Sequence, residues 1–203
     1  MLFAKIKQHY EAVVAVCCFL ILFTNVGLPS TSFSVYQPYL VDLPGVGHSG
    51  GSIIVSVRTF VSLLAMLVVG RYYDLVDCRI GAFLATLSVS AGFALYSLAG
   101  SNFGMLCGAS ALTGLGYGFG GMIASTMLIN RWFRVNVATV AGVAAVGSGV
   151  AAIVIPNAAV ALISVFDLQT AFRAEAALAL VIGVTVFALL RNDPRDMGLT
   201  PYE

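Results

Sequence analysis

Six apolar runs, each about long enough or more than long enough to cross a lipid bilayer, follow one another along this 203-residue chain. A membrane-spanning helix needs about 20 mostly apolar residues, so six helices with short connections would use nearly the whole length. The runs cover residues 11–41, 52–70, 80–99, 103–129, 137–165 and 170–190 approximately. The sequence therefore predicts an all-α, polytopic membrane protein whose residues 1–203 form one six-helix transmembrane domain.

Charged residues are too scarce to cover a water-soluble surface. Only 9% of the residues are charged and 60% are hydrophobic, whereas soluble domains carry about 25% charged residues. The net charge of +1 gives no basic patch that could bind nucleic acid. The composition excludes a soluble domain, a disordered protein and a nucleic-acid-binding protein, and it indicates a lipid bilayer as the natural solvent.

The cations predict an orientation in the membrane. Six spans leave both termini on one side, and eight of the ten Lys and Arg residues fall there: Lys5, Lys7, Arg71, Arg79, Arg131, Arg134, Arg191 and Arg195. Cytoplasmic loops carry such an excess, so we expect both termini in the cytoplasm and the protein in a cell membrane (plasma or inner). Trp132 and Phe133, which end the fourth run, are expected to form an aromatic anchor at the lipid interface.

The first run is longer than the bilayer core requires. At 1.5 Å per residue it would measure about 46 Å as a helix, so this helix must be tilted or broken, and Gly27 and Pro29 are expected to supply the break. Small residues let helix backbones approach closely in lipid. We expect that role for the glycines of the fourth and fifth runs: Gly104, Gly108, Gly114, Gly116, Gly118, Gly120, Gly142, Gly147 and Gly149.

Two glycine motifs match enzyme signatures without their structural context. Residues 47–51 match G-x-S-x-G and residues 116–121 match G-x-G-x-x-G. Both signatures need a preceding strand, and none is predicted here, so neither motif indicates an enzyme site. Residues 49–52 are better interpreted as a loop that caps the second helix. The four Cys residues show no metal-ligand spacing and are expected to be buried thiols. We predict no enzymatic activity, no catalytic residue, no metal and no cofactor.

Arg58 is the most informative charge, because it lies about seven residues into the second run. An Arg at the centre of a span costs about 2.5–3.5 kcal/mol on insertion scales, and such residues usually face an aqueous cavity or a partner. A guanidinium group suits a carboxylate or a phosphate. The alternatives are that Arg58 extends to the interface or pairs structurally with an acid.

Polar side chains in the first and fifth runs also lie at membrane depth. Broken helices with freed backbone groups build substrate sites in many transporters, while hydrogen bonds between helices are the alternative. The candidate substrate-binding residues are Arg58, Thr31, Ser34, Gln37, Asn25 and Asn157. Arg173 and Glu175 open the sixth run near its outer end, where we expect structural pairing with neighbours. No acid is expected at mid-membrane, so no coupling residue is predicted.

The connection after the second run carries a family likeness. Residues 70–79 read G-R-Y-Y-D-L-V-D-C-R, which resembles the loop 2–3 signature G-x-x-x-D-R-x-G-R-[RK] of the major facilitator superfamily. Gly70, Asp74 and Arg79 match this signature, whereas residues 75, 77 and 78 depart from it. Residues 130–133 (N-R-W-F) and 191–199 (R-N-D-P-R-D-M-G-L) are similar to segments of the oxalate/formate-antiporter-like and monocarboxylate-transporter-like branches.

This resemblance implies a secondary active transporter that works by alternating access. In it, Arg58 would attract a small anionic solute, which we expect to be a carboxylate. The family has twelve spans in two halves, each a 3+3 inverted repeat, and the chain resembles the N-terminal half. A second six-helix half or a homodimer is then the expected partner. By the same resemblance, Gly70 would allow close helix packing, and Asp74 and Arg79 would belong to a gating latch. The alternative is a truncated or non-transporting membrane subunit or scaffold.

Overall fold

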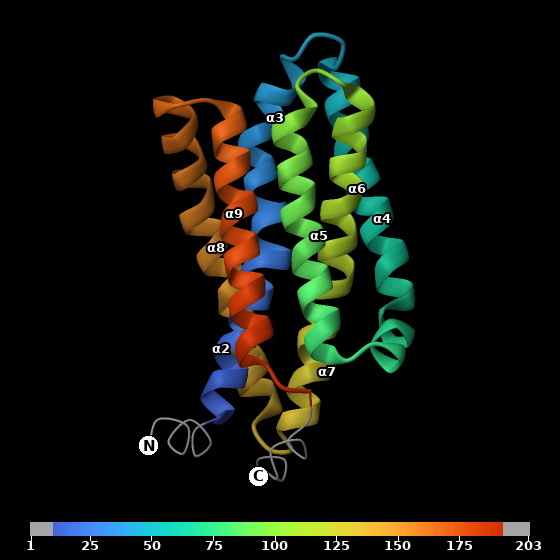
Figure 1. The fold of residues 1–203 in the computed structure, drawn as a ribbon, viewed down its shortest axis with the longest axis vertical. Helices are drawn as coiled ribbons and strands as arrows, with labels where there is room; N and C mark the ends of the chain where they lie inside the picture. Colours follow the sequence, from blue (N-terminus) through green and yellow to red (C-terminus); the bar gives the residue numbers. More distant parts are fainter. Residues whose placement is uncertain (1–9, 193–203) are drawn as a thin grey trace.

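The structure, a computed structural model, describes residues 10–192 of the chain. In this part of the chain, six helical segments are long and apolar enough to cross a membrane, and they run side by side as one bundle (Figure 1). The prediction of an all-α protein with six spans is confirmed.

The first span consists of α2 (Tyr10–Leu22), the π-helical segment η1 (Phe23–Ser32) and α3 (Phe33–Val41). The second span is α4 (Gly47–Leu75) and the third is α5 (Cys78–Ala99). The fourth span is divided at Gly121 into α6 (Phe103–Gly120) and α7 (Met122–Trp132). The fifth and sixth spans are α8 (Val137–Val165) and α9 (Leu168–Leu189).

The second helix begins earlier than the sequence suggested. Residues 47–51 form the first turn of α4, and the residue at its N-cap is Val46, which makes no side-chain capping bond. The prediction of a capping loop at residues 49–52 is therefore wrong. Several glycines there weaken the helix signal, but the structure continues α4 through them. Gly50 packs against α6, since a Cβ there would lie 3.3 Å from Phe103 Cε2 of that helix.

The first span is irregular in the segment where Gly27 and Pro29 lie. Proline has no N–H for the helical ladder, and residues 23–32 adopt wider π-helical turns around it. The Thr31 hydroxyl donates to the Gly27 carbonyl at 2.7 Å. Because Gly27 lacks a side chain, α8 approaches η1 so closely that a Cβ on Gly27 would collide with the Cβ of Ala151. The expected break is thus a π-helical stretch inside a continuous span.

The helices are ordered so that α5 lies inside the bundle and α4 and α8 lie at its two edges (Figure 1). Helix α5 packs against α6 and α9, α6 packs against α4, and the first span packs against α8. Gly114 of α6 makes the contact with α4 possible, because a Cβ there would lie 2.6 Å from the Arg58 carbonyl oxygen. The edge helices are consequently the least covered.

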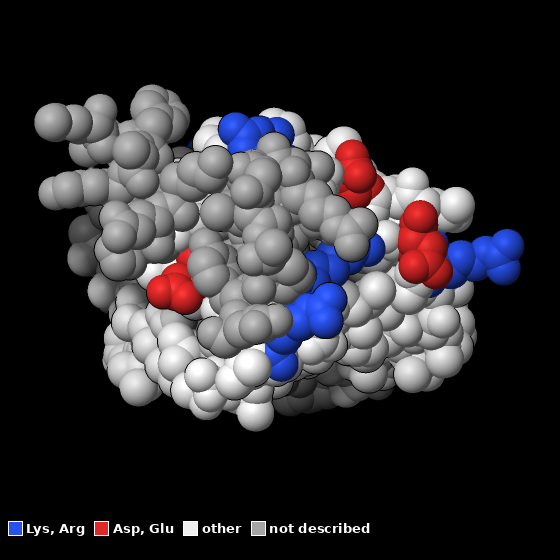
Figure 2. All heavy atoms as spheres, turned by 90° about the horizontal axis from the view of Figure 1, so that it is seen from below, with Lys and Arg blue, Asp and Glu red and all other residues white. Residues whose placement is uncertain are grey.

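The two ends of the bundle differ in charge. Five Arg residues lie near the helix ends where α2 begins and α9 finishes, which we call the basic end: Arg71, Arg79, Arg131, Arg134 and Arg191. Figure 2 shows this end, with blue Lys and Arg atoms near its centre and at its margins. Lys5, Lys7 and Arg195 lie outside the described residues. The connections at the opposite end contain Asp42 and Asp167 and no cation, so we call it the acidic end.

Only some of the glycines expected to pack closely do so. A Cβ would meet atoms of a neighbouring helix at less than ordinary contact distance at Gly114, Gly116, Gly118, Gly120 and Gly147. Among the described residues, a Cβ would meet nothing within 4 Å at Gly70, Gly142 and Gly149, and nothing closer than 3.4 Å at Gly104 and Gly108. The prediction of close packing is wrong within this chain for the latter five.

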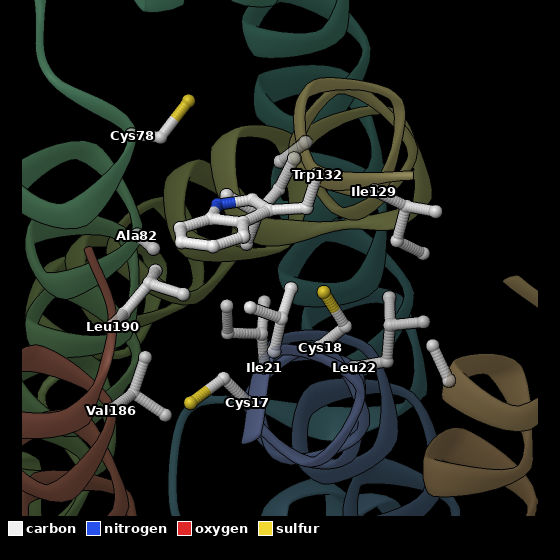
Figure 3. Close-up of a cluster of buried hydrophobic side chains, with 14 of the residues drawn as sticks. Cys17, Cys18, Ile21, Leu22, Cys78, Ala82, Ile129, Trp132, Val186 and Leu190 are labelled. Atoms are coloured by element: carbon white, nitrogen blue, oxygen red, sulfur yellow. The ribbon is translucent and has the colours of Figure 1, made fainter. Parts of the chain in front are cut away.

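Trp132 lies in the core near the basic end rather than at the lipid interface. Its side chain is fully buried, and its ring centroid is 4.7 Å from that of Tyr10. Figure 3 shows it pointing among side chains of α2, α5 and the end of α9. Phe133 is also buried, so the prediction of an interfacial aromatic anchor is wrong. Cys17, Cys18 and Cys78 are buried thiols, as expected, and Cys107 is half-buried.

Candidate functional site

Arg58 projects from α4 toward the irregular part of the first span. It lies eleven residues after Gly47, about 16 Å along the helix from its acidic end. Its Nη1 donates a hydrogen bond to the Pro29 carbonyl, and the guanidinium lies over the Phe33 ring, 5.1 Å from the centroid. The cation therefore contacts the place where proline interrupts the regular helix.

The guanidinium retains donors that could bind an anion. Arginine has five N–H groups, and within residues 10–192 the Pro29 carbonyl is the acceptor that its side chain contacts. One structural alternative for Arg58 was an ion pair with an acid, and no described residue forms such a pair with it. Its direction, toward the neighbouring span, also differs from that of an Arg that extends to the membrane surface. A half-buried guanidinium with open donors can bind a carboxylate or a phosphate.

Ser34 and Gln37 meet in a pocket near the acidic end. This pocket has a volume of about 340 Å³ and is also lined by Pro38, Val41, Asp42 and His48. The exposed Ser34 hydroxyl donates to the Thr31 carbonyl at 2.7 Å. Arg58 does not line this pocket, so the structure places these two candidates together but apart from the guanidinium. His48 is a further lining residue that the sequence does not single out, because its only sequence signal is the G-x-S-x-G match at residues 47–51.

Asn25 and Asn157 lie elsewhere. The Asn25 side chain is fully buried, and its Nδ2 donates to the Ile21 carbonyl at 3.1 Å and to Thr86 Oγ1 of α5 at 3.0 Å. Asn157 is exposed on the edge helix α8, where its Nδ2 donates to the Ile153 carbonyl at 2.6 Å. The six candidate substrate-binding residues therefore do not form one site. Ser34 and Gln37 line one pocket, and Asn25 and Asn157 each lie elsewhere. Arg58 and Thr31 have in common only that each side chain donates to a backbone carbonyl of η1.

Glu175 is a buried acid near the outer end of the sixth span. It is 5% exposed, and its Oε1 accepts a hydrogen bond from the Tyr36 hydroxyl of α3 at 2.7 Å. The pairing with a neighbour was expected, but the burial was not. The helical period offered a signal, because the neighbours of residue 175 on its own face are Ala171, Phe172 and Ala179, all buried.

The loop 2–3 residues make contacts across the basic end. Arg79 Nε donates to the Phe187 carbonyl of α9 at 2.6 Å, and the guanidinium lies 4.2 Å from the centroid of that ring. Arg131 donates to the Tyr73 carbonyl at the end of α4, at 3.4 Å. Asp74 is exposed and makes no ion pair with a described residue. Arg79 thus fastens α5 to α9, while Asp74 and Gly70 face open space on α4.

Metal binding finds no support in the described residues, where no group of three or more His, Cys, Asp or Glu side chains could hold an ion. A sequence model described as Major Facilitator Superfamily matches residues 14–202, which is nearly the whole chain. No curated protein matches the chain.

Proposed function

Because the chain belongs to the Major Facilitator Superfamily, a family of membrane transporters, we propose that it moves a small carboxylate across the bilayer by alternating access. Arg58 is the observation that carries this proposal. It is a half-buried cation, about 16 Å inside α4, with donors that no described acid occupies. In a low-dielectric site, a guanidinium binds an anion far more strongly than it does in water.

The contacts of Arg58 also suggest how binding could be linked to movement. The guanidinium holds the Pro29 carbonyl and lies over the Phe33 ring, so an anion that draws the guanidinium away would release both contacts on the first span. A ligand shifts a conformational equilibrium only when it binds two states differently. The π-helical segment supplies a place where the two states could differ. At the basic end, Asp74 and Arg79 would take part in the corresponding gate.

We further propose that a second six-helix unit covers the edge helices, whether it is another half or a second copy. On α8, the exposed residues at positions 142, 146, 149, 153, 157, 160 and 164 fall on one face. On α4, positions 52, 56, 59, 63, 67 and 74 fall on one exposed face, on which Gly70 also lies. Both faces include polar and small residues, and lipid is a poor solvent for polar groups. We also propose that both termini lie in the cytoplasm and that the protein lies in a cell membrane, because the cations gather at the basic end of the bundle.

Uptake into proteoliposomes tests the proposal. The full chain, alone and together with a candidate second half, would be assayed with a panel of radiolabelled carboxylates. We expect uptake by the wild type and a loss of roughly 10- to 100-fold in apparent affinity for Arg58→Ala, because a hydrogen bond to a charged group contributes about 1.5–3 kcal/mol. Arg58→Lys keeps the charge but loses bidentate geometry, so it should fall between the two.

Arg173→Ala is the matched control, because Arg173 is an exposed cation near the acidic end of α9. It should transport like the wild type. Carboxylate uptake that is unchanged in Arg58→Ala would refute the anion-binding role. If no combination with a second unit transports any member of the panel, the alternative of a non-transporting subunit is favoured.

A further inference from the structure

Glu175 is the buried acid of the bundle that the proposed solute site does not use. It lies seven residues into α9, about 10 Å from the start of that helix. The Tyr36 hydroxyl donates to its Oε1, and within residues 10–192 its Oε2 has no hydrogen-bond partner. A carboxylate at this place would lose its hydration with no cation to compensate the charge, so a neutral carboxyl group suits the site better.

Within residues 10–192, no cation contacts the Glu175 carboxyl, whose polar neighbours are Tyr36 and Ser32. Helices α5, α2 and α8 and the segment η1 all pack against α9. Neither α8 nor η1 contains a titratable residue. Those of α2 (Tyr10, Glu11 and two Cys), and Cys78 and Arg79 of α5, lie toward the basic end, while Arg173 of α9 itself is exposed. The titratable groups nearby are the hydroxyls of Tyr36, which donates to the carboxyl, and of Tyr96 on α5, whose ring stacks on Phe172.

The environment is suited to holding and releasing one proton. Ser32 of η1 lies beside the same carboxyl, and its Oγ, like Glu175 Oε2, has no hydrogen-bond partner in the described part of the chain. These two oxygens could form a hydrogen bond in which a protonated Oε2 donates, or in which Ser32 donates to the ionised group. Either charge state can thus be accommodated, but with different positions of the Ser32 hydroxyl.

A pocket at the acidic end is lined in part by Phe172, which lies one helical turn from this carboxyl. It has a volume of about 270 Å³ and is lined by residues of α3, α5, α6, α9 and their connections, including Tyr96, Asp167 and Phe172. Asp167 lies at the start of α9 and is exposed, while Phe172 lies one turn before Glu175 on the same helix face. The Phe172 ring packs against the rings of Tyr36 and Tyr96, with centroid separations of 4.4 and 5.2 Å. We call these three rings the Phe172 layer: Phe172 lines the pocket and packs against Tyr36, whose hydroxyl donates to Glu175.

We propose that Glu175 carries the coupling proton, which it takes from water in the pocket at the acidic end when the Phe172 layer opens. This inference rests on the proposed transport function. The proton binds a carboxylate oxygen and converts the group to a neutral carboxyl. It returns to water on the other side after the conformational change. The first span links the two sites, because Ser32 and Tyr36 contact Glu175 while Pro29 and Phe33 contact Arg58.

Two measurements on the full chain in liposomes test this assignment, with Glu11→Gln as the matched control at an exposed acid. The first is the infrared difference spectrum between acid and alkaline buffer. We expect a protonated-carboxyl C=O band that Glu175→Gln removes and that Glu11→Gln retains. Tyr36→Phe should shift this band, because it removes the hydrogen bond to Oε1. A band that persists unchanged in Glu175→Gln would overturn the proposal.

The second measurement compares carboxylate uptake driven by a pH gradient with carboxylate exchange at equal pH, using the chain with its second unit where one is required. Glu175→Gln should lose gradient-driven uptake and keep exchange, because exchange needs no net proton movement. Gradient-driven uptake by Glu175→Gln at the wild-type rate would overturn the proposal. A wild type that shows neither activity refutes the transport function instead, and the infrared band then decides separately whether Glu175 binds a proton.

Discussion

Two glycines of α8 allow the packing of the first span against the fifth to be tested directly. A Cβ on Gly147 would collide with the carbonyl oxygen of Phe19 on α2 and would lie 3.1 Å from its carbonyl carbon. That is about 0.4 Å inside the shortest ordinary carbon–carbon contact of about 3.5 Å. A Cβ on Gly149 would meet nothing within 4 Å. The two positions are two residues apart and therefore lie on nearly opposite faces of the helix.

Replacing either residue by Ala adds the same methyl group and the same gain in helix propensity, up to about 1 kcal/mol. The difference between Gly147→Ala and Gly149→Ala therefore isolates the cost of overpacking. We expect Gly147→Ala to be less stable by about 1–3 kcal/mol, the usual range for an inserted methylene in a packed interior.

The assay is the free energy of unfolding of the purified full chain in mixed micelles, from titration with a denaturing detergent. Equal stabilities of the two variants would refute the contact between α8 and α2. A further variant, Gly149→Leu, separates this contact from the proposed second unit. It should unfold like Gly149→Ala but should weaken cross-linking to the second unit in membranes.

Two other predictions concern the ends of the bundle. Trp132→Ala should lower the free energy of unfolding by about 3–5 kcal/mol, because it empties a fully buried site; a loss no larger than that of the exposed control Phe166→Ala would contradict the burial. Asp167 accepts a hydrogen bond from the Thr170 N–H at 2.6 Å, and hydrogen bonding to Thr170 holds the pKa of Asp167 below its usual value. Its stabilisation is then present above the unfolded pKa of about 3.9 and is lost as pH falls through the lower folded value. Asp167→Ala should thus lower the Tm at neutral pH, and the difference in Tm from the wild type should shrink on acidification. Asp42→Ala, the control, should not show this pH dependence. A difference in Tm that does not change with pH would exclude the Asp167 cap as its cause.

Much of the fold was predictable, because a bilayer imposes its demands on each segment separately. A span must satisfy its own backbone hydrogen bonds and must be apolar over about 20 residues, and both properties can be recognised locally. The interruption of the first span was predictable for a similar reason, since Pro29 lacks the N–H that a regular helix requires. The extent of the π-helical segment was not, because it depends on how closely α8 approaches Gly27.

The candidate site was less predictable than the fold. The depth of Arg58 could be counted from the sequence, but its contacts with Pro29 and Phe33 depend on how α4 is rotated against the first span. Asn25 and Gln37 look alike as polar residues of one span. The structure places Asn25 against α5 and Gln37 in a pocket near the acidic end.

The sequence by itself determined that the chain occupies a membrane, how many times it crosses, and which ends of its helices carry the cations. These properties depend on the solvent that each segment meets. Only the tertiary structure decided that Trp132 lies in the core, that Gly147 but not Gly149 meets a neighbour, and that Glu175 pairs with Tyr36. In lipid, apolar residues suit both the core and the surface of a bundle, so hydrophobicity does not distinguish the two faces of a helix. The buried face is chosen by close packing and hydrogen bonds between segments that are distant in the chain.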